Sequence, residues 1–367
     1  MTSQDILYSD LYSQAIARPA ASADMLHVLS GYASPAMLAR VIEDLPPHVR
    51  VHLVIGMVGH EGLPFRDHEG YLALQTRNPL RVRISYTTAG RSVHSKLYVW
   101  LKDGMPIQAF AGSSNFTQNG FLVGWRRRLH AELLTSVDPQ EAEQLFLQVE
   151  GESLNSLHPD VDGEIEIHSR PRASEKSAAV NDEWDADTVL AGAEAVVLPL
   201  VAQQNAPRTG TIRGNTHEQW GLNWGVNRGR SNRNEAVIPV PMRIWRANPE
   251  FFPRGEPGNR PVFHVTTDDN KSLMLVVAEQ KDKALHSLPS NGAIGEYFRY
   301  RLGVANGHKV QTDHLHSFGS RFVKFYKLDD ESFHMVFSPD IDSEGARIYG
   351  FDDLPIDAQS ASDDQDD

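Results

Sequence analysis

The sequence predicts a mixed α/β domain followed by an all-β domain. Between residues 24 and 151, apolar segments of strand length alternate with amphipathic segments of helical period, as in an α/β sheet with crossover connections. From residue 196 to 338, short apolar segments are separated by clusters of Gly, Pro, Asn and Asp, which favours a barrel or sandwich. A chain of 367 residues can bury a core in each of two domains.

The first domain begins its alternation with a strand and a capped helix. Ser34 and Pro35 follow an apolar segment, and they predict a helix start because serine caps a helix and proline fits its first turn. The strands are expected at 25–33, 49–59, 80–88, 92–101, 107–114 and 126–137, and the helices at 36–45, in the polar segment that ends at 76, and at 139–154. The strands of the second domain are expected at 196–201, 236–245, 261–267, 272–280, 322–328 and 333–338.

Composition sets the domain boundaries. Residues 158–188 are rich in Asp, Glu, Ser and Pro and poor in apolar side chains, which is typical of a linker. We therefore place the first domain at 1–157, the second domain at 189–352 and a solvated acidic tail at 353–367.

Composition also excludes several classes of protein. The net charge of −13 argues against non-specific coating of nucleic acid, so DNA contacts have to come from local basic patches. The chain has no cysteine, which excludes disulfides, thiolate nucleophiles and cysteine-based zinc sites. It also shows no paired-histidine metal motif, no signal peptide and no apolar segment of membrane length. We expect a cytoplasmic protein without a dedicated metal site or membrane contact.

One short motif in a predicted strand carries the chemistry. Successive side chains of a strand alternate between faces, so His94 and Lys96 are expected to project into one pocket. An imidazole supplies a nucleophile for phosphorus, and an ammonium supplies fixed positive charge for the other oxygens of a phosphodiester. The next strand opens into Gly112, Ser113 and Asn115, whose backbone, hydroxyl and amide can bind the same anion. The two motifs together indicate phosphodiester chemistry.

Each motif taken alone has an ordinary structural interpretation. A His-x-Lys on an amphipathic strand usually lies on a solvated face, and Gly-Ser-Ser-Asn is a common turn. Their order within apolar strands favours a functional site.

The two motifs resemble the signature of the phospholipase D superfamily, in its nuclease branch. The residues that carry the resemblance are His94-Ser95-Lys96 and Gly112-Ser113-Ser114-Asn115-Phe116-Thr117. The resemblance implies that His94 attacks phosphorus to give a phosphohistidine, and that Lys96 and Asn115 bind the phosphate. It further implies that Ser113 is a supporting donor and that a carboxylate on the following strand orients the histidine. Glu132 is the candidate for that carboxylate.

Two polar segments in the second domain predict DNA contacts, because arginine can read guanine, asparagine can read adenine, and both can hold phosphate. The candidates in the first segment, 221–235, are Asn223, Trp224, Arg228, Arg230, Asn232, Arg233 and Asn234. The candidates in the second segment, 280–303, are Lys281, Lys283, Ser290, Asn291 and Arg299. A merely solvated polar loop is the alternative for either segment alone.

The order of motifs in the second domain resembles the C-terminal B3-like pseudobarrel of restriction endonucleases of the NgoFVII, NgoAVII and CglI type. The residues that carry it include Gly221-Leu222-Asn223-Trp224-Gly225, Arg233-Asn234-Glu235-Ala236, Thr267-Asp268-Asp269 and Gly295-Glu296-Tyr297-Phe298-Arg299. The resemblance implies an α/β phospholipase D-like nuclease domain followed by an all-β B3-like pseudobarrel DNA-recognition domain. It also implies that 221–235 and 280–303 are two arms that embrace duplex DNA; we call them the first arm and the second arm.

The two resemblances imply a sequence-specific restriction endonuclease, type II-like or ATP-dependent, that hydrolyses DNA through a phosphohistidine without a metal at the nuclease site. Superfamily active centres use two His-x-Lys motifs and this chain has one, so we expect a homodimer through the nuclease domain. The chain has no phosphate-binding Gly-x-x-x-x-Gly-Lys-Ser/Thr loop, so ATP and magnesium would enter only through a helicase-like ATPase subunit. The alternatives are a phospholipid-processing phosphatidyltransferase and a non-cutting DNA-binding regulator.

Overall fold

The computed structural model describes residues 6–88, 90, 92–121, 131–168, 190, 192–203, 214–226, 232–256, 259–279 and 282–352. Three predicted DNA contacts, Arg228, Arg230 and Lys281, lie outside the described residues, as do the acidic tail and most of the predicted linker. The chain divides into two compact units. The larger comprises 1–194, 248–282 and 327–334, and the smaller comprises 195–247, 283–326 and 335–367.

An eight-stranded sheet with the order β1-β8-β7-β6-β2-β3-β5-β9 forms the centre of the larger unit. Strands β2, β3 and β5 are parallel, as expected from the alternation with helices, while β6, β7 and β8 are antiparallel neighbours. The strands are β1 (Ile6–Leu7), β2 (Met25–Ser30), β3 (Arg50–Ile55), β5 (Val82–Thr87), β6 (Lys96–Lys102), β7 (Met105–Gly112), β8 (Leu134–Val137) and β9 (Ser153–Asn155).

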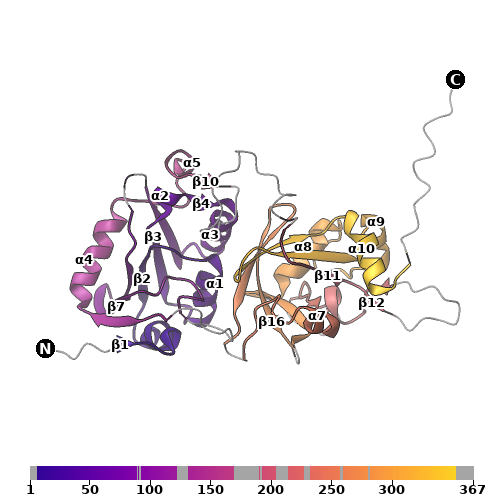
Figure 1. Ribbon diagram of the computed structural model, residues 1–367, viewed down its shortest axis with the longest axis horizontal. Helices are drawn as coiled ribbons and strands as arrows, with labels where there is room; N and C mark the ends of the chain where they lie inside the picture. The colour runs from indigo at the N-terminus through magenta and orange to yellow at the C-terminus, as the bar shows by residue number, and fades with distance from the viewer. Residues whose placement is uncertain are drawn as a thin grey trace, which may run out of the picture. The chain divides into compact units, whose positions relative to one another are not determined.

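Helices cover both faces of this sheet. Figure 1 shows α4 on one face and α1 and α3 on the other. The helices of this part are η1 (Tyr12–Ala17, a π-helix), η2 (Pro19–Ala21), α1 (Pro35–Asp44), α2 (Val58–Glu61), α3 (Phe65–Arg77), α4 (Pro139–Glu150) and α5 (Val161–Glu164). Two short strands, β4 (Leu63–Pro64) and β10 (Ile167–His168), pair separately. The predicted start of α1 is confirmed, because Ser34 Oγ accepts a hydrogen bond from Met37 N at 3.1 Å.

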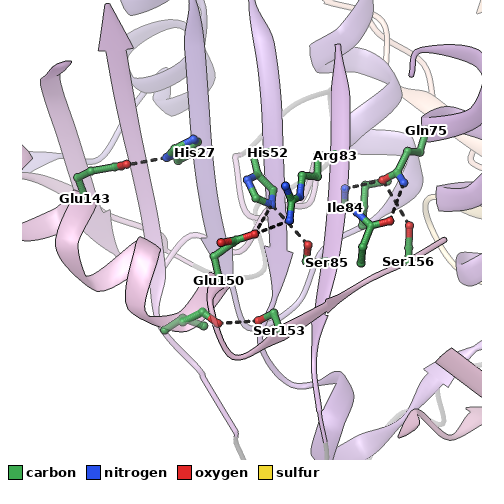
Figure 2. Close-up of polar contacts among 12 residues, drawn as sticks. His27, His52, Gln75, Arg83, Ile84, Ser85, Glu143, Glu150, Ser153 and Ser156 are labelled. Carbon is green, nitrogen blue, oxygen red and sulfur yellow. Dashed lines mark hydrogen bonds and ion pairs between the residues drawn. The ribbon is translucent and has the colours of Figure 1, made fainter. Parts of the chain in front are cut away.

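The face under α4 carries a buried polar cluster (Figure 2). His27 and His52 lie opposite each other on β2 and β3, and their rings meet edge to face at 5.7 Å. From α4, Glu143 lies 2.9 Å from His27 Nδ1, and Glu150 lies 3.8 Å from His52 Nε2. Phe146 stacks on the His27 ring at 4.2 Å, so α4 is attached to the sheet by ring packing and by polar contacts together.

A second sheet has seven strands in the order β11-β18-β19-β15-β16-β17-β14. Its strands are β11 (Ala195–Pro199), β14 (Ile238–Pro239), β15 (Val262–Thr267), β16 (Ser272–Ala278), β17 (Ala284–Leu288), β18 (Phe322–Lys327) and β19 (Ser332–Val336). Two more short strands, β12 (Ala202–Gln203) and β13 (Gly214–Asn215), pair with each other. The β15–β16 hairpin belongs to the larger unit, where α1 packs on β15 and α3 packs on β16.

Helices accompany the sheet where the sequence predicted strands or loops. The expected strand at 236–245 is wrong beyond Pro239, because residues from 242 form α7 (Met242–Ala247). The second arm is not one loop, since it contains β17 and α8 (Gly292–Arg301). The remaining helices are η3 (Gly221–Asn223), α9 (Thr312–Phe318) and α10 (Asp340–Tyr349).

None of the helices in the described part of the chain has the length and apolar character needed to cross a bilayer. Within the same residues, no group of three or more His, Asp or Glu side chains is placed to hold a metal ion.

Candidate functional site

The predicted catalytic residues meet at one edge of the eight-stranded sheet. The register pairs Ser30, the last residue of β2, with Lys96, the first residue of β6. Strand β7 runs antiparallel to β6 and ends at Gly112, so the following Ser113 and Asn115 return to the same edge. The topology of three strands therefore gathers two motifs that are separate in the sequence.

His94 and Lys96 lie side by side, although only one of them is on the strand. Strand β6 begins at Lys96, so the prediction that both residues alternate within a strand is wrong for His94. Lys96 Nζ lies 2.9 Å from His94 Nδ1 and 3.1 Å from Nε2, and it donates a 2.6 Å hydrogen bond to the His94 carbonyl oxygen. His94 is exposed and Lys96 is buried, which leaves the imidazole accessible with a cation fixed beside it.

The electrostatic surroundings of Lys96 combine burial with one carboxylate. Burial lowers the pKa of the Lys96 ammonium, and the charge of Glu132 partly opposes that shift in pKa. A cation held in a partly desolvated place interacts more strongly with a phosphate than one in bulk water. This placement suits a fixed anion clamp.

Asn115 is oriented by the backbone at the end of β2. Its Oδ1 accepts a hydrogen bond from Tyr32 N at 3.3 Å, which turns the amide nitrogen, its donor group, away from that contact. The next residue, Phe116, donates its N–H to Tyr32 O at 3.2 Å and to Ser30 Oγ at 2.9 Å. The backbone that follows Asn115 is therefore fixed to the end of β2 and to the turn after it.

Ser113 and Glu132 form a contact of their own. Ser113 Oγ donates a short hydrogen bond to Glu132 Oε2 and accepts one from Leu133 N at 3.1 Å. Glu132 lies just before β8, which begins at Leu134, rather than within a strand. The carboxylate thus contacts Ser113 in this structure, and its role in orienting His94 stays a prediction.

Two residues of the site were missed in the sequence. The ring of Tyr32 meets the His94 ring edge to face at 5.7 Å, and its hydroxyl donates to Glu61 Oε1 at 2.7 Å. A Cβ on Gly31 would lie 3.2 Å from both Cα and Cδ2 of His94, so the histidine packs closely against a glycine. Both follow β2 directly, and the end of a strand at the same edge is the signal that points to them.

The two predicted arms meet at their bases in the smaller unit. Ala236 N donates to Asn291 O at 2.9 Å, and Asn234 Nδ2 donates to Glu296 Oε1 at 3.4 Å. A Cβ on Gly295 would lie 1.7 Å from Asn234 O, so no other residue fits there without movement. The structure therefore brings together two segments that the sequence presents separately.

Three of the side chains predicted to contact DNA are buried and contact other parts of the protein instead. Asn223 is fully buried, and its amide binds the carbonyl oxygens of His217 and Val310 and the N–H of Val310 at 2.8–2.9 Å. Arg299 is also fully buried and donates to four backbone carbonyl oxygens from both arms and the segment after α8. Trp224 packs in an apolar cluster with Val237. In this structure these three side chains stabilise the arms through buried hydrogen bonds and apolar packing.

The other described candidates lie at the surface or near it. Arg233, Lys283 and Ser290 are exposed, while Asn232, Asn234 and Asn291 are half-buried. Asn232 Oδ1 accepts from Asn234 N at 2.9 Å, and Ser290 Oγ accepts from Gly292 N at 3.3 Å. Among the described candidates, Arg233 and Lys283 thus present positive charge that DNA could reach.

Two family models match the chain in the order that the motifs predicted. Residues 9–163 match the N-terminal phospholipase D domain of the NgoFVII restriction endonuclease. Residues 194–329 match its C-terminal B3-like DNA-binding domain. The chain belongs to the NgoFVII restriction endonuclease family. The predicted fold class is confirmed, with a phospholipase D-like domain first and a B3-like domain second, and family membership supports a nuclease that binds DNA.

Solved structures resemble this family member only over part of its length. One is polyphosphate kinase from Porphyromonas gingivalis, with 14% identity and a TM-score of 0.30 over 41% of this chain and 26% of that chain. Another is a mutant of yeast tyrosyl-DNA phosphodiesterase, with 18% identity and a TM-score of 0.25 over 36% of this chain and 30% of that chain. The chain therefore spans about a quarter to a third of the length of these structures. No curated protein sequence matches it.

Proposed function

We propose that this family member cleaves duplex DNA at a selected sequence through a covalent phosphohistidine on His94. The observation that carries the proposal is the placement of an exposed imidazole 2.9 Å from the buried Lys96 ammonium. Asn115 stands at the same sheet edge with its amide oxygen tied to Tyr32 N. This arrangement supports one nucleophile with two donors for the phosphate oxygens.

The reaction would proceed in two displacements. A ring nitrogen of His94 attacks phosphorus, a phosphorus–nitrogen bond forms, and the bond to the leaving oxygen of the cut strand breaks as that oxygen takes a proton from a general acid. Water then attacks the phosphohistidine while the deprotonated general acid takes a proton from it; the phosphorus–nitrogen bond breaks, which releases a phosphate monoester and restores the imidazole. Lys96 and Asn115 would donate to the phosphate oxygens in both steps, so positive charge comes from the chain and metal independence is part of the proposal.

Cleavage in a chelator tests the chemical part. We expect the wild-type chain to nick or cut plasmid DNA in EDTA, and His94→Ala to reduce the rate by at least about 1,000-fold because the nucleophile is lost. His48→Ala removes an exposed histidine of the same unit and is the matched control. Full activity in His94→Ala, or strict dependence on added magnesium in the wild type, contradicts the mechanism.

We further propose that the general acid is His94 of a second copy. The support is the count of motifs, because the sequence contains a single His-x-Lys and one centre needs two imidazoles in different roles. Two nuclease domains would face each other across a two-fold axis, so that each contributes the same surface. Such a shared centre cuts one strand at a time.

The arms are proposed to select the sequence. The support is the exposed positive charge of Lys283 and of Arg233, which stands between Asn232 and Asn234 in the sequence. A gel-shift selection from random duplexes, run at a stated salt concentration, measures this directly. Recovery of one short sequence supports the proposal, and unselected binding of all duplexes argues against it.

A helicase-like ATPase is proposed as a partner subunit. The support is the resemblance to the NgoAVII and CglI type and the absence of a phosphate-binding loop from this sequence. Co-purification with the products of neighbouring genes, followed by cleavage with and without ATP and magnesium, tests it. Equal cleavage under both conditions would leave the type II-like alternative.

The two rival functions have less support. A phosphatidyltransferase has no use for a B3-like DNA-binding domain, and vesicle binding by the chain would favour it. A non-cutting regulator has no use for His94 beside Lys96, and binding without cleavage by the wild type would favour that alternative.

A further inference from the structure

The segment that follows Asn115 is attached to residues far along the chain, within the larger unit. We call residues 113–121 the clamp segment, because it carries Ser113 and Asn115. Phe116 and Phe121 are buried, and a Cβ on Gly120 would lie 2.3 Å from Asn115 O. The segment therefore folds back tightly on Asn115. Contacts that fix residues 118–121 consequently also fix the position of Asn115.

Gln118 fixes that far end to the first residue of β15. Its Nε2 donates to Val262 O at 2.5 Å, and its Oε1 accepts from Val262 N at 2.8 Å. A carboxamide offers one donor and one acceptor side by side, so it pairs with the peptide groups of a strand as a neighbouring strand would. The side chain of Gln118 is 2% exposed, which means that loss of either contact leaves a buried polar group unpaired.

Glu331 fixes the same segment from a second side. Its Oε1 accepts from Asn119 N at 3.2 Å, and its Oε2 accepts from Ser34 Oγ at 2.5 Å. Ser34 caps α1 and donates its own N–H to Phe116 O at 3.0 Å. One buried carboxylate thus connects the clamp segment with the turn that leaves β2.

Burial and neighbouring groups set the pKa of the Glu331 carboxyl group, whose two oxygens accept the hydrogen bonds described above. Burial and the charge of Asp329 raise its pKa to about 7, while the hydrogen bonds from Ser34, Asn119 and Gln118 lower the pKa in part. Arg66 of α3 pairs with Asp329 at 3.0 Å. A glutamine at this position could accept from Asn119 N with its amide oxygen and donate to Ser34 Oγ with its amide nitrogen, so both contacts remain without a charge but the direction of one is reversed.

We propose that Gln118 and Glu331 are positioning residues for phosphodiester cleavage, which hold Asn115 against the phosphate by tying the clamp segment to β15 and to the turn before β19. Neither contacts the reacting atoms. The inference rests on the proposed function, since it concerns the same site. It also means that residues of the B3-like match, Val262 among them, take part in fixing the nuclease centre.

Arg40 offers a matched control. It lies on α1 and donates to Arg260 O at 2.9 Å and to Asn259 Oδ1 at 3.1 Å, just before β15. Like Gln118 it is buried and makes two hydrogen bonds to this stretch of chain, but both end outside the clamp segment. Arg40→Ala therefore weakens the same attachment without releasing Asn115.

The test uses the full chain and bis(p-nitrophenyl) phosphate, a phosphodiester that needs no recognition sequence and no partner subunit. We expect Gln118→Ala and Glu331→Ala to lower kcat by about 100-fold, as misplacement of a reacting group by about 1 Å does, with KM changed far less. Glu331→Gln should retain kcat within about threefold of wild type, because its amide can accept from Asn119 N and donate to Ser34 Oγ. Arg40→Ala should keep kcat within about twofold of the wild type, since both of its hydrogen bonds to this stretch end outside the clamp segment.

Hydrogen exchange on the same variants separates failure of this inference from failure of the proposed function. The amides of 116–121 should exchange faster in Gln118→Ala than in Arg40→Ala. Equal rates of hydrolysis and exchange in these two variants overturn the inference. If the wild type does not hydrolyse the phosphodiester at all, the proposed function fails and the catalytic part of the inference fails with it; exchange then still decides whether Gln118 holds the segment.

Discussion

At the scale of single residues, the chemistry of the site depends on which end of the Asn115 amide faces the phosphate. Tyr32 N holds Oδ1, so the amide nitrogen is the group presented to an anion. Asn115→Asp keeps an oxygen for Tyr32 and replaces the donor with a negative oxygen. We expect kcat/KM for DNA cleavage to fall by about 100- to 1,000-fold, which is the cost of losing one donor to a charged transition state.

Unfolding temperature is the control measurement for that substitution. Since the contact with Tyr32 remains, the midpoint should change by no more than about 2–4 °C, which corresponds to about 1 kcal/mol in a folding unit of about 150–250 residues. A variant that cuts at the wild-type rate would show that Asn115 does not bind the phosphate.

Single residues also show what the sequence could and could not predict. His94, Lys96 and Asn115 were predicted to share one site because their chemical types are unusual in that order, and the structure places them at one sheet edge. Asn223 and Arg299 were predicted to contact DNA because of the polar composition of the two arms. Both are instead buried and bind backbone carbonyl groups. Asparagine and arginine bind peptide groups as well as they bind bases, so composition alone cannot separate the two uses.

At the scale of elements, the central strands were easier to predict than the type of a short apolar segment. The parallel strands β2, β3 and β5 follow from nearly continuous apolar segments, because a central strand buries both faces. Residues 236–245 carry the same apolar content but turn into α7 after Pro239, since a short apolar segment has no period that distinguishes strand from helix. The two histidines under α4 were not predicted either, because their partners Glu143 and Glu150 lie about 100 residues away in the sequence.

That polar cluster predicts how stability depends on pH. Burial lowers the pKa of His52 from 6.5 to about 3, and the charges of His27 and Arg83 add to the decrease in pKa, while Glu143 and Glu150 face the cluster from α4. The unfolded chain then binds a proton near pH 6.5 that the folded chain does not bind until about pH 3. This contribution to the free energy of unfolding is therefore complete above pH 6.5 and is lost as the pH falls toward 3.

His52→Gln removes the titrating group from that cluster. Between pH 6 and 5, the free energy of unfolding of the variant should fall less steeply than that of the wild type, by up to about 1.4 kcal/mol per pH unit for one proton. Denaturant unfolding at pH 7, 6 and 5 measures the two slopes. Parallel slopes would mean that the folded and unfolded chains protonate His52 alike.

At the scale of the whole molecule, the nuclease unit is not one continuous stretch of sequence. The larger unit takes in residues 248–282 and 327–334, and its β15 strand receives the Gln118 side chain. The order of motifs predicted two domains with separate tasks, and the family matches follow that order. No local pattern indicates that a hairpin within the second match packs on α1 and α3, because such contacts depend on residues more than 200 positions apart.

The proposed homodimer makes a quantitative prediction for mixed protomers. If one centre needs His94 from two copies, a dimer with one His94→Ala protomer is inactive, whichever protomer carries the change. When wild-type and variant chains are mixed in equal amounts and allowed to exchange subunits, only dimers with two wild-type protomers are active, which is about a quarter of the total for random pairing. Independent monomers would instead retain about half, because each wild-type chain would act alone. Plasmid nicking measured across a series of mixing ratios distinguishes the two cases: a square dependence on the wild-type fraction supports the shared centre, and a linear dependence excludes it.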